Sequence, residues 1–193
     1  MATETIAQTT TSVPRRRFTV AEYQRMGEVG IFTEDDRVEL IEGEMYQMSP
    51  IGIRHARCVN RLTVILSRHL EPDMLPNVQN PIYLPGENAP QPDLAIVRDR
   101  DSGDDLWPTP ADILLVIEVS DSTLAHDRGT KLPLYAAAGI AEAWIVDLAA
   151  ATVERHTDPR DGLYRLVASA RPGESLASTV LPALAIPVAD ILQ

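Results

Sequence analysis

Apolar residues recur along the chain with helical spacing in three places. The longest such stretch is Ile53–Leu70, where apolar positions three and four residues apart predict a helix with one buried face. A shorter helix is predicted over Phe18–Glu28, with Thr19 as its N-cap. A third is predicted over Lys131–Ala138 and should end at Gly139, because glycine readily terminates a helix.

Short runs of β-branched and aromatic residues, each bounded by turn residues, predict strands. These runs are Val78–Leu84, Asp93–Val97, Ile113–Val119, Glu142–Asp147, Thr152–Thr157 and Tyr164–Ala168. A turn cluster from Asp158 to Gly162 joins the last two. Val38–Met48 has two apolar arms around Glu42 and Gly43, a pair favoured in tight loops, and so predicts a β-hairpin.

The order of these elements predicts the α/β class, with a mixed central β-sheet flanked by helices, an N-terminal β-hairpin and C-terminal strands. The strand, helix and strand between Ile113 and Asp147 should form a parallel pair with a crossover helix. A chain of 193 residues can bury one core, so we expect one domain over residues 18–193 and a disordered polar tail over residues 1–17. The segment from Pro172 onward mixes proline and leucine and predicts no clear element.

Composition indicates a soluble cytoplasmic protein. No stretch reaches the roughly 18 apolar residues that a membrane helix needs. The basic run Arg15–Arg17 follows a polar segment and does not precede an apolar one, as it would in a signal peptide. Cys58 is the only cysteine, which excludes an internal disulfide and fits a reducing compartment.

The net charge of -11 gives no long-range attraction to nucleic acid, so any phosphate contacts must come from a local basic patch. Arg54, Arg57 and Arg61 fall in one sector of the helix predicted over Ile53–Leu70, away from its apolar face. They are candidate phosphate contacts. The alternative is an ordinary solvated helix face.

Two carboxylates are predicted to meet in the centre of the sheet. If the strands of Asp93 and Glu118 pair antiparallel with these two residues opposite each other, Val97 pairs with Leu114 and both carboxylates share one face. Carboxylates so placed repel each other unless a cation lies between them, and oxygen ligands suit Mg²⁺ or Mn²⁺ better than Zn²⁺. The alternatives are a turn residue for Asp93 and an arginine salt bridge for Glu118.

Lys131 is the only lysine among 17 basic residues, which makes it a candidate catalytic cation. The alternative is a surface lysine paired with Asp127 at the start of a helix. His55 lies on an apolar helix face and is either a core histidine or an accessory to the site. Tyr135 is expected to pack in the core, and His126 to lie in a loop.

Several motifs in this order resemble one known family, the Uma-type endonucleases of the PD-(D/E)XK restriction-endonuclease-like superfamily. The motifs are the segments 39–44 (ELIEGE), 91–97 (QPDLAIV), 117–120 (IEVS), 127–136 (DRGTKLPLYA) and 143–147 (AWIVD), with His55. The likeness runs from Phe18 to Leu166. Ser120 stands where the superfamily has its lysine, two residues after the glutamate, and Lys131 matches the Uma-type position on the following helix.

This resemblance implies a metal-dependent endonuclease that hydrolyses phosphodiester bonds in DNA, and a homodimer. Asp93 and Glu118, with the Val119 carbonyl, would hold Mg²⁺ or Mn²⁺, and Lys131 would position the attacking water. Glu39 would be a third carboxylate near the metal. The alternative is an inactive nuclease-fold protein that binds nucleic acid or protein. The sequence shows no aromatic stacking platform and so does not separate DNA from RNA.

Overall fold

The computed structural model describes residues 15–33, 36–99 and 107–192. Its centre is a six-stranded sheet in the order β3-β4-β5-β6-β7-β8, in which only β5 and β6 are parallel. The strands are β3 (Met74–Val78), β4 (Leu94–Arg98), β5 (Ile113–Ser120), β6 (Glu142–Asp147), β7 (Thr152–Arg160) and β8 (Leu163–Ala170). This mixed sheet confirms the predicted fold class, including the parallel pair.

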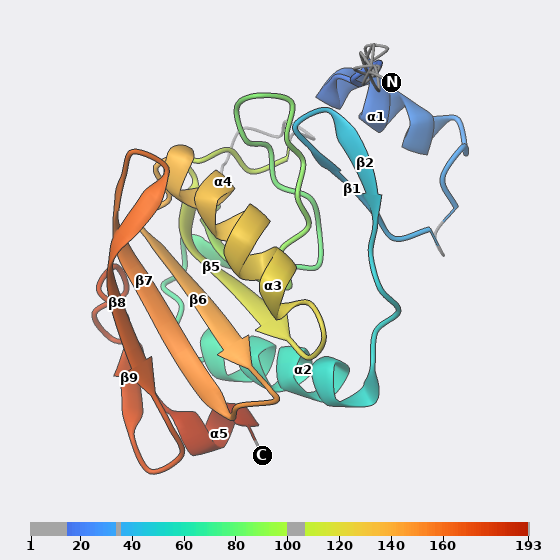
Figure 1. Cartoon of the computed structure of the whole chain (residues 1–193). Helices are drawn as coiled ribbons and strands as arrows, with labels where there is room; N and C mark the ends of the chain where they lie inside the picture. The colour runs from blue at the N-terminus through green and yellow to red at the C-terminus, as the bar shows by residue number, and fades with distance from the viewer. Residues whose placement is uncertain (1–14, 34–35, 100–106, 193) are drawn as a thin grey trace, which may run out of the picture.

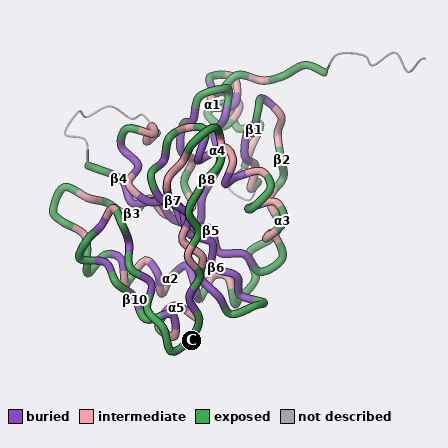
Figure 2. Tube along the Cα trace, turned by 60° about the vertical axis from the view of Figure 1, so that its left-hand side comes forward, coloured by how far each residue is buried: buried purple, intermediate pink, exposed green. Residues whose placement is uncertain are grey.

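Helices cover both faces of the sheet (Figure 1). The helix α2 (Ile53–Ser67) packs on one face, and α3 (Leu124–His126) with α4 (Leu132–Ala137) crosses the other. Side chains on β4 and β5 alternate between the two faces, as strand geometry requires. The middle strands are therefore buried on both sides, and burial falls off toward the outer edges (Figure 2).

The N-terminal part forms a hairpin with a short helix beside it. In the hairpin, β1 (Val38–Ile41) pairs with β2 (Glu44–Gln47), and Glu42 and Gly43 both have positive φ, as the predicted two-residue turn requires. The helix α1 (Val20–Glu28) begins at Thr19, whose side chain forms the predicted N-cap within a capping box. The first 14 residues of the predicted tail lie outside the described residues.

The C-terminal segment completes the core under α2. It contains the two-stranded pair β9 (Ser175–Ala177) and β10 (Ala185–Pro187), followed by the helix α5 (Val188–Leu192). Six of its apolar side chains are buried in the same cluster as α2, namely Leu176, Leu181, Leu184, Ile186, Val188 and Ile191. The proline and leucine pattern from Pro172 therefore supplies a layer of the core, which the sequence did not reveal.

The buried carboxylate of Glu142 attaches this segment to the sheet. Glu142 is fully buried and accepts hydrogen bonds from the Trp144 indole N–H at 2.7 Å and from the Thr179 backbone N–H at 2.7 Å. It also accepts a hydrogen bond from the Thr179 hydroxyl. These donors join β6 to the loop between β9 and β10.

Three local predictions are wrong. The strand predicted over Val78–Leu84 is displaced, because β3 ends at Val78 and Gln79 turns the chain with a φ of 51°. The strand β7 continues through Pro159, so the predicted turn shortens to Asp161 and Gly162. Proline is tolerated there because β6 pairs with β7 only as far as Thr157, so Pro159 has a neighbouring strand on one side alone.

A register shift between Ile96 and Val97 corrects the third prediction, since Val97 pairs with Ile113 and not with Leu114. Ile113 consequently joins the face of Ala95 and Val97, whereas Leu114 packs on the opposite cluster. In the described ranges, no helix is both long and apolar enough to cross a membrane.

Candidate active site

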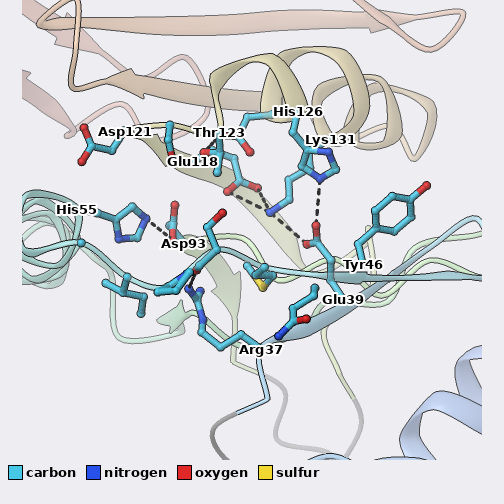
Figure 3. A pocket seen from close by; sticks show the side chains of 18 residues that line it. Arg37, Glu39, Tyr46, His55, Asp93, Glu118, Asp121, Thr123, His126 and Lys131 are labelled. Carbon is cyan, nitrogen blue, oxygen red and sulfur yellow. Dashed lines mark hydrogen bonds and ion pairs between the residues drawn. The ribbon is translucent and has the colours of Figure 1, made fainter.

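A cavity of about 420 Å³ opens where β5 ends, between the β1–β2 hairpin, the start of α2 and the segment that follows β5 (Figure 3). Besides Asp127, four charged side chains at this cavity are almost fully buried. Their exposed fractions are 2% for Glu39, 6% for Asp93, 2% for Glu118 and 3% for Lys131. Charged groups are rarely buried unless they are paired, so their partners decide what the cavity can do.

The register of β4 and β5 brings Asp93 beside Glu118. Leu94 pairs with Ile117, and the same register continued by one residue places Asp93 opposite Glu118, as predicted. The bulge lies further along the strands and leaves this end undisturbed. One Asp93 oxygen, Oδ2, accepts the Val119 backbone N–H at 2.8 Å.

The other Asp93 oxygen, Oδ1, lies 2.9 Å from His55 Nε2 and accepts the Gln79 amide at 3.3 Å. Burial would raise the pKa of Asp93, but the hydrogen bonds from His55 and Val119 outweigh it and hold that pKa below its usual range. Asp93 is therefore ionised at neutral pH. The ring atom His55 Nδ1 is buried and has no hydrogen-bond partner among the described residues.

The pKa of Glu118 shifts in the opposite direction to that of Asp93, because Glu118 is more deeply buried. Its Oε1 accepts the Tyr135 hydroxyl at 2.5 Å and lies 3.3 Å from Lys131 Nζ. Burial raises the pKa of Glu118 to about 8, although the charge of Lys131 lowers it. The two carboxylates predicted to act together therefore differ in proton affinity. Tyr135 is a core residue, as predicted, and it also holds Glu118.

The amine of Lys131 reaches this cluster from the helical segment on the second face of the sheet. Lys131 Nζ lies 3.3 Å from Glu118 Oε1 and 3.2 Å from Glu39 Oε2, and it donates to the Gln91 carbonyl at 3.3 Å. Burial would lower the pKa of Lys131, but Glu118 and Glu39 raise it above its usual value. Lys131 is therefore a permanent cation. Asp93 acts on it only at longer range.

A turn of π-helix, Asp127–Lys131, sets the direction of this side chain. In an α-helix, residues five apart point about 140° away from each other. The wider π-turn brings His126 and Lys131 to the same face, and both reach Glu39. The short α3 that precedes it places His126 in a helix, not in the predicted loop.

Asp127 anchors the start of the π-turn and does not pair with Lys131. Asp127 Oδ2 accepts hydrogen bonds from the Ser120 hydroxyl at 2.7 Å and from the Thr123 hydroxyl at 2.6 Å. Ser120, which stands where the superfamily has a lysine, thus helps to hold the segment that delivers Lys131. The alternative of a surface lysine paired with Asp127 is wrong.

Glu39, at the hairpin side of the cavity, has both oxygens engaged by other groups. Oε1 lies 3.1 Å from His126 Nε2, and Oε2 accepts the Gln91 backbone N–H at 3.3 Å beside Lys131. Burial would raise the pKa of Glu39, but the hydrogen bond with His126 and the charge of Lys131 lower it further than burial raises it. Glu39 therefore holds Lys131 and His126 in place.

Comparison with known proteins places the chain in a family. Residues 20–189 match the model of the Uma2 family, described as "Putative restriction endonuclease". The chain belongs to this family. A solved structure of a "putative nuclease belonging to DUF820" from Anabaena variabilis aligns with 86% of the Uma2 chain and 96% of its own length, at a TM-score of 0.68 and 13% identity. At that identity the likeness shows the fold alone. No curated protein matches the chain.

Sequence reasoning missed three residues that build the site of this Uma2 chain. His126 is 87 positions from Glu39, and α-helical spacing does not align it with Lys131. Gln91 connects Glu39 to Lys131 through its backbone N–H and carbonyl. Any residue type other than proline offers these two groups, so the sequence does not indicate the connection. Gln79 supports Asp93 from a left-handed backbone conformation that few side chains adopt, an arrangement common at functional sites.

Two of the three arginines predicted as phosphate contacts on α2 form hydrogen bonds within the Uma2 chain itself. Arg54 donates to the Leu148 carbonyl at 2.6 Å and pairs with Asp121 at 3.2 Å, beside the cavity. Arg61 donates to the Ile191 carbonyl at 3.4 Å. Arg57 is exposed. Arg54 and Arg57 therefore remain candidate phosphate contacts, while Arg61 supports the C-terminal helix.

The oxygen donors in the cavity fit a hard divalent cation. Within the described ranges, no group of three or more His, Cys, Asp or Glu side chains is placed to hold a metal. Asp93 and Glu118 offer two carboxylates beside an open cavity, and Mg²⁺ is usually held by one or two carboxylates with water and substrate oxygens. A closed zinc site needs four protein ligands, so the residues fit Mg²⁺ or Mn²⁺ better.

Proposed function

We propose that the protein is a metal-dependent endonuclease that hydrolyses phosphodiester bonds in DNA. The observation that carries the proposal is the position of Lys131, whose amine lies between Glu118 and Glu39 at the base of an open cavity. A buried, permanently charged lysine beside carboxylates that can hold a cation is suited to a reaction in which negative charge develops on phosphate. Family membership supports the same class of reaction.

Asp93 and Glu118, with the Val119 carbonyl, are the proposed ligands of Mg²⁺ or Mn²⁺. When bound, such an ion neutralises charge on the phosphate and lowers the pKa of a water ligand. The protein's own contribution is to orient these groups. The Val119 N–H and His55 fix the two oxygens of Asp93, and the Tyr135 hydroxyl fixes one oxygen of Glu118.

Lys131 would orient the attacking water and offset the developing charge. Glu39 and the Gln91 carbonyl hold its amine in place, so little reorganisation is needed during the reaction. Glu39 therefore acts as a positioning residue for Lys131. In this scheme His55 is likewise a positioning residue, because it acts through Asp93.

A homodimer is part of this proposal, on the strength of the family resemblance. The edge strand β8 supports it by exposing three apolar side chains, Leu163, Leu166 and Val167. Analytical ultracentrifugation should find a dimer, and Leu166→Lys should shift it toward the monomer. A wild-type chain that remains monomeric at high concentration would contradict this part of the proposal.

The test is cleavage of plasmid and single-stranded DNA with Mg²⁺, with Mn²⁺ and with EDTA. Asp93→Ala, Glu118→Ala and Lys131→Ala should each abolish cleavage, whereas Asp121→Ala, at the edge of the same cavity, should retain it. Cleavage that survives all three substitutions refutes the assignment. Nucleic-acid binding without cleavage would instead favour the alternative, a nuclease-fold binding protein, which the net charge of -11 does not exclude.

A further inference from the structure

The cavity has two chemically different walls. The side of the cavity that runs from Tyr46 in β2 to Gly52 before α2 contributes Tyr46, Met48, Pro50 and Ile51, with the polar Gln47 and Ser49 among them. The opposite wall carries Glu118, His126 and Lys131, while Glu39 lies on the hairpin beside Tyr46. In Figure 3, Tyr46 lies at the end of the cavity near His126 and Lys131, while Asp121 and His55 lie at the other end. A nucleotide has the same division into an apolar base and a charged phosphate.

The rings of Tyr46 and His126 form an aromatic pair at one end of this cavity. Their centroids are 6.0 Å apart and their planes are tilted by 40°. The Tyr46 side chain is 39% exposed, and its hydroxyl contacts Glu44 at a long distance of 3.4 Å. An exposed ring beside a phosphate-cleaving centre is where proteins stack an unpaired base. The sequence did not reveal this pair because its members are 80 positions apart.

The burial of the charged cluster limits which substrates can reach it. The four charged side chains are at most 6% exposed, and the cavity of about 420 Å³ has the size of a small-molecule pocket. A duplex presents its phosphates on a stiff, wide surface with the bases stacked inside. An unpaired strand can bend and insert one nucleotide, with its base turned out.

The net charge of the protein also favours a single strand over a duplex. Duplex DNA carries one negative charge per about 1.7 Å of axis, and a single strand carries half as many. The net charge of -11 repels both, and repels the duplex more strongly. Arg37, the arginine that lines the cavity, donates a hydrogen bond to the Ser49 carbonyl at 2.9 Å, and Arg54, which lies nearby, is paired with Asp121. Stacking, which is independent of charge, would then supply much of the affinity.

We propose that this cavity accepts a single nucleic-acid strand in preference to an intact duplex, and that Tyr46 and His126 stack the base next to the scissile phosphate. The proposal deepens the nuclease function and rests on it for the cleavage step. DNA and RNA strands share the chemistry that the cavity recognises, so the test includes both.

The experiment compares binding in EDTA, measured by fluorescence anisotropy, for a DNA strand, an RNA strand of the same sequence and the DNA duplex. We expect at least about tenfold tighter binding of one strand than of the duplex. Tyr46→Ala should weaken strand binding about tenfold, in line with the loss of one stacked base, and Tyr46→Phe should retain it. Tyr83→Ala is the matched control, because Tyr83 is also 39% exposed and lies outside the cavity lining.

Cleavage of the same three substrates with Mg²⁺ forms the second arm. Duplex binding equal to that of both strands, or a Tyr46→Ala effect no larger than that of Tyr83→Ala, overturns the proposal. Tyr46-dependent strand binding without any cleavage would refute the nuclease function and leave the strand site standing. The strand with the larger Tyr46 dependence identifies the natural sugar.

Discussion

At the scale of single residues, the site depends on a buried acid that keeps its proton. Glu118 and Asp93 lie side by side, yet burial raises the pKa of Glu118 to about 8 while His55 and Val119 lower that of Asp93. Two neighbouring carboxylates of unequal proton affinity carry one negative charge at neutral pH, and Glu39, whose pKa is lowered, carries a second one beside Lys131. The proton on Glu118 therefore limits the repulsion among these carboxylates when no metal is bound.

The free energy of unfolding of the metal-free protein should fall as pH rises from about 4.5 to about 8. The folded state keeps a proton on Glu118 that the unfolded state has released, so each step up in pH favours unfolding. Asp93 and Glu39 have lowered pKa values, so their contribution is lost only at more acidic pH. We expect a loss of about 3 to 5 kcal/mol, measured by urea denaturation in EDTA.

Glu118→Gln is the control for this pH dependence, because it keeps the shape of the side chain and cannot titrate. Its unfolding free energy should vary less with pH over the same range. Identical slopes in wild type and variant would show that Glu118 ionises normally.

Lys131→Arg should reduce turnover by about 100-fold while the fold is retained. The amine lies within 3.5 Å of both Glu118 oxygens, and a planar guanidinium cannot occupy that compact position. Lys131→Met should also destabilise the protein by about 3 kcal/mol, because it leaves buried carboxylates unpaired. Steady-state cleavage and thermal denaturation measure the two effects.

Arg128→Lys is the matched substitution for Lys131→Arg. Arg128 lies three residues earlier on the same turn but pairs with Glu154 on β7, away from the cavity lining. It should leave turnover within about threefold of wild type. If Lys131→Arg is equally harmless, any cation suffices at that position and the role assigned to Lys131 is wrong.

At the scale of secondary structure, local patterns predicted the elements that follow standard periods. The hairpin turn at Glu42 and Gly43, the helix α2 and the register of Asp93 opposite Glu118 follow from turn chemistry and from counting along strands. The bulge at Val97 and the π-turn before Lys131 break those periods. The sequence carries no periodic signal for either, so Lys131 was assigned to the site from its being the only lysine and from the family resemblance, and His126 was missed.

Deleting Gly129 should convert the π-turn to an α-turn, so that His126 and Lys131 no longer lie on the same face of the helical segment. His126 and Asp127 would shift by one position relative to Lys131, so the pairing of His126 with Glu39 would be lost. We expect a folded protein with at least about tenfold lower activity. Far-ultraviolet circular dichroism and the cleavage assay measure the two properties.

Gly129→Ala keeps the chain length and tests the same position. A Cβ there meets no atom within 4 Å, so the substitution should stabilise the helix by about 0.5 to 1 kcal/mol and leave activity unchanged. Full activity in the deletion variant would show that the π-turn is not needed to position His126.

At the scale of the whole molecule, the segment after Pro172 completes the core on the face of the sheet that α2 covers. It covers α2 with buried apolar side chains and is fixed to β6 through Glu142. Its pattern was hard to interpret because no element in it exceeds five residues. Its hydrophobic positions are set by contact with α2 and not by a helix or strand period of their own.

Glu142→Ala should lower the free energy of unfolding by about 2 to 4 kcal/mol. The substitution leaves the buried N–H groups of Trp144 and Thr179 without their acceptor. Urea denaturation measures the effect, and Glu174→Ala, at an exposed position, should cost less than about 1 kcal/mol. Similar losses for both variants would mean that the C-terminal segment is held by apolar packing alone.

The segment between β2 and α2 lets substrate preference and catalytic chemistry reside in different parts of the chain. Residues 48–52 form one wall of the cavity and belong to no helix or strand, whereas the charged groups are mounted on the sheet and its helices. Loops tolerate insertion and exchange far better than cores. Randomising these five residues should therefore alter substrate preference and leave the chemistry intact. Changes in the length of this loop would likewise adapt the same fold to new substrates during evolution.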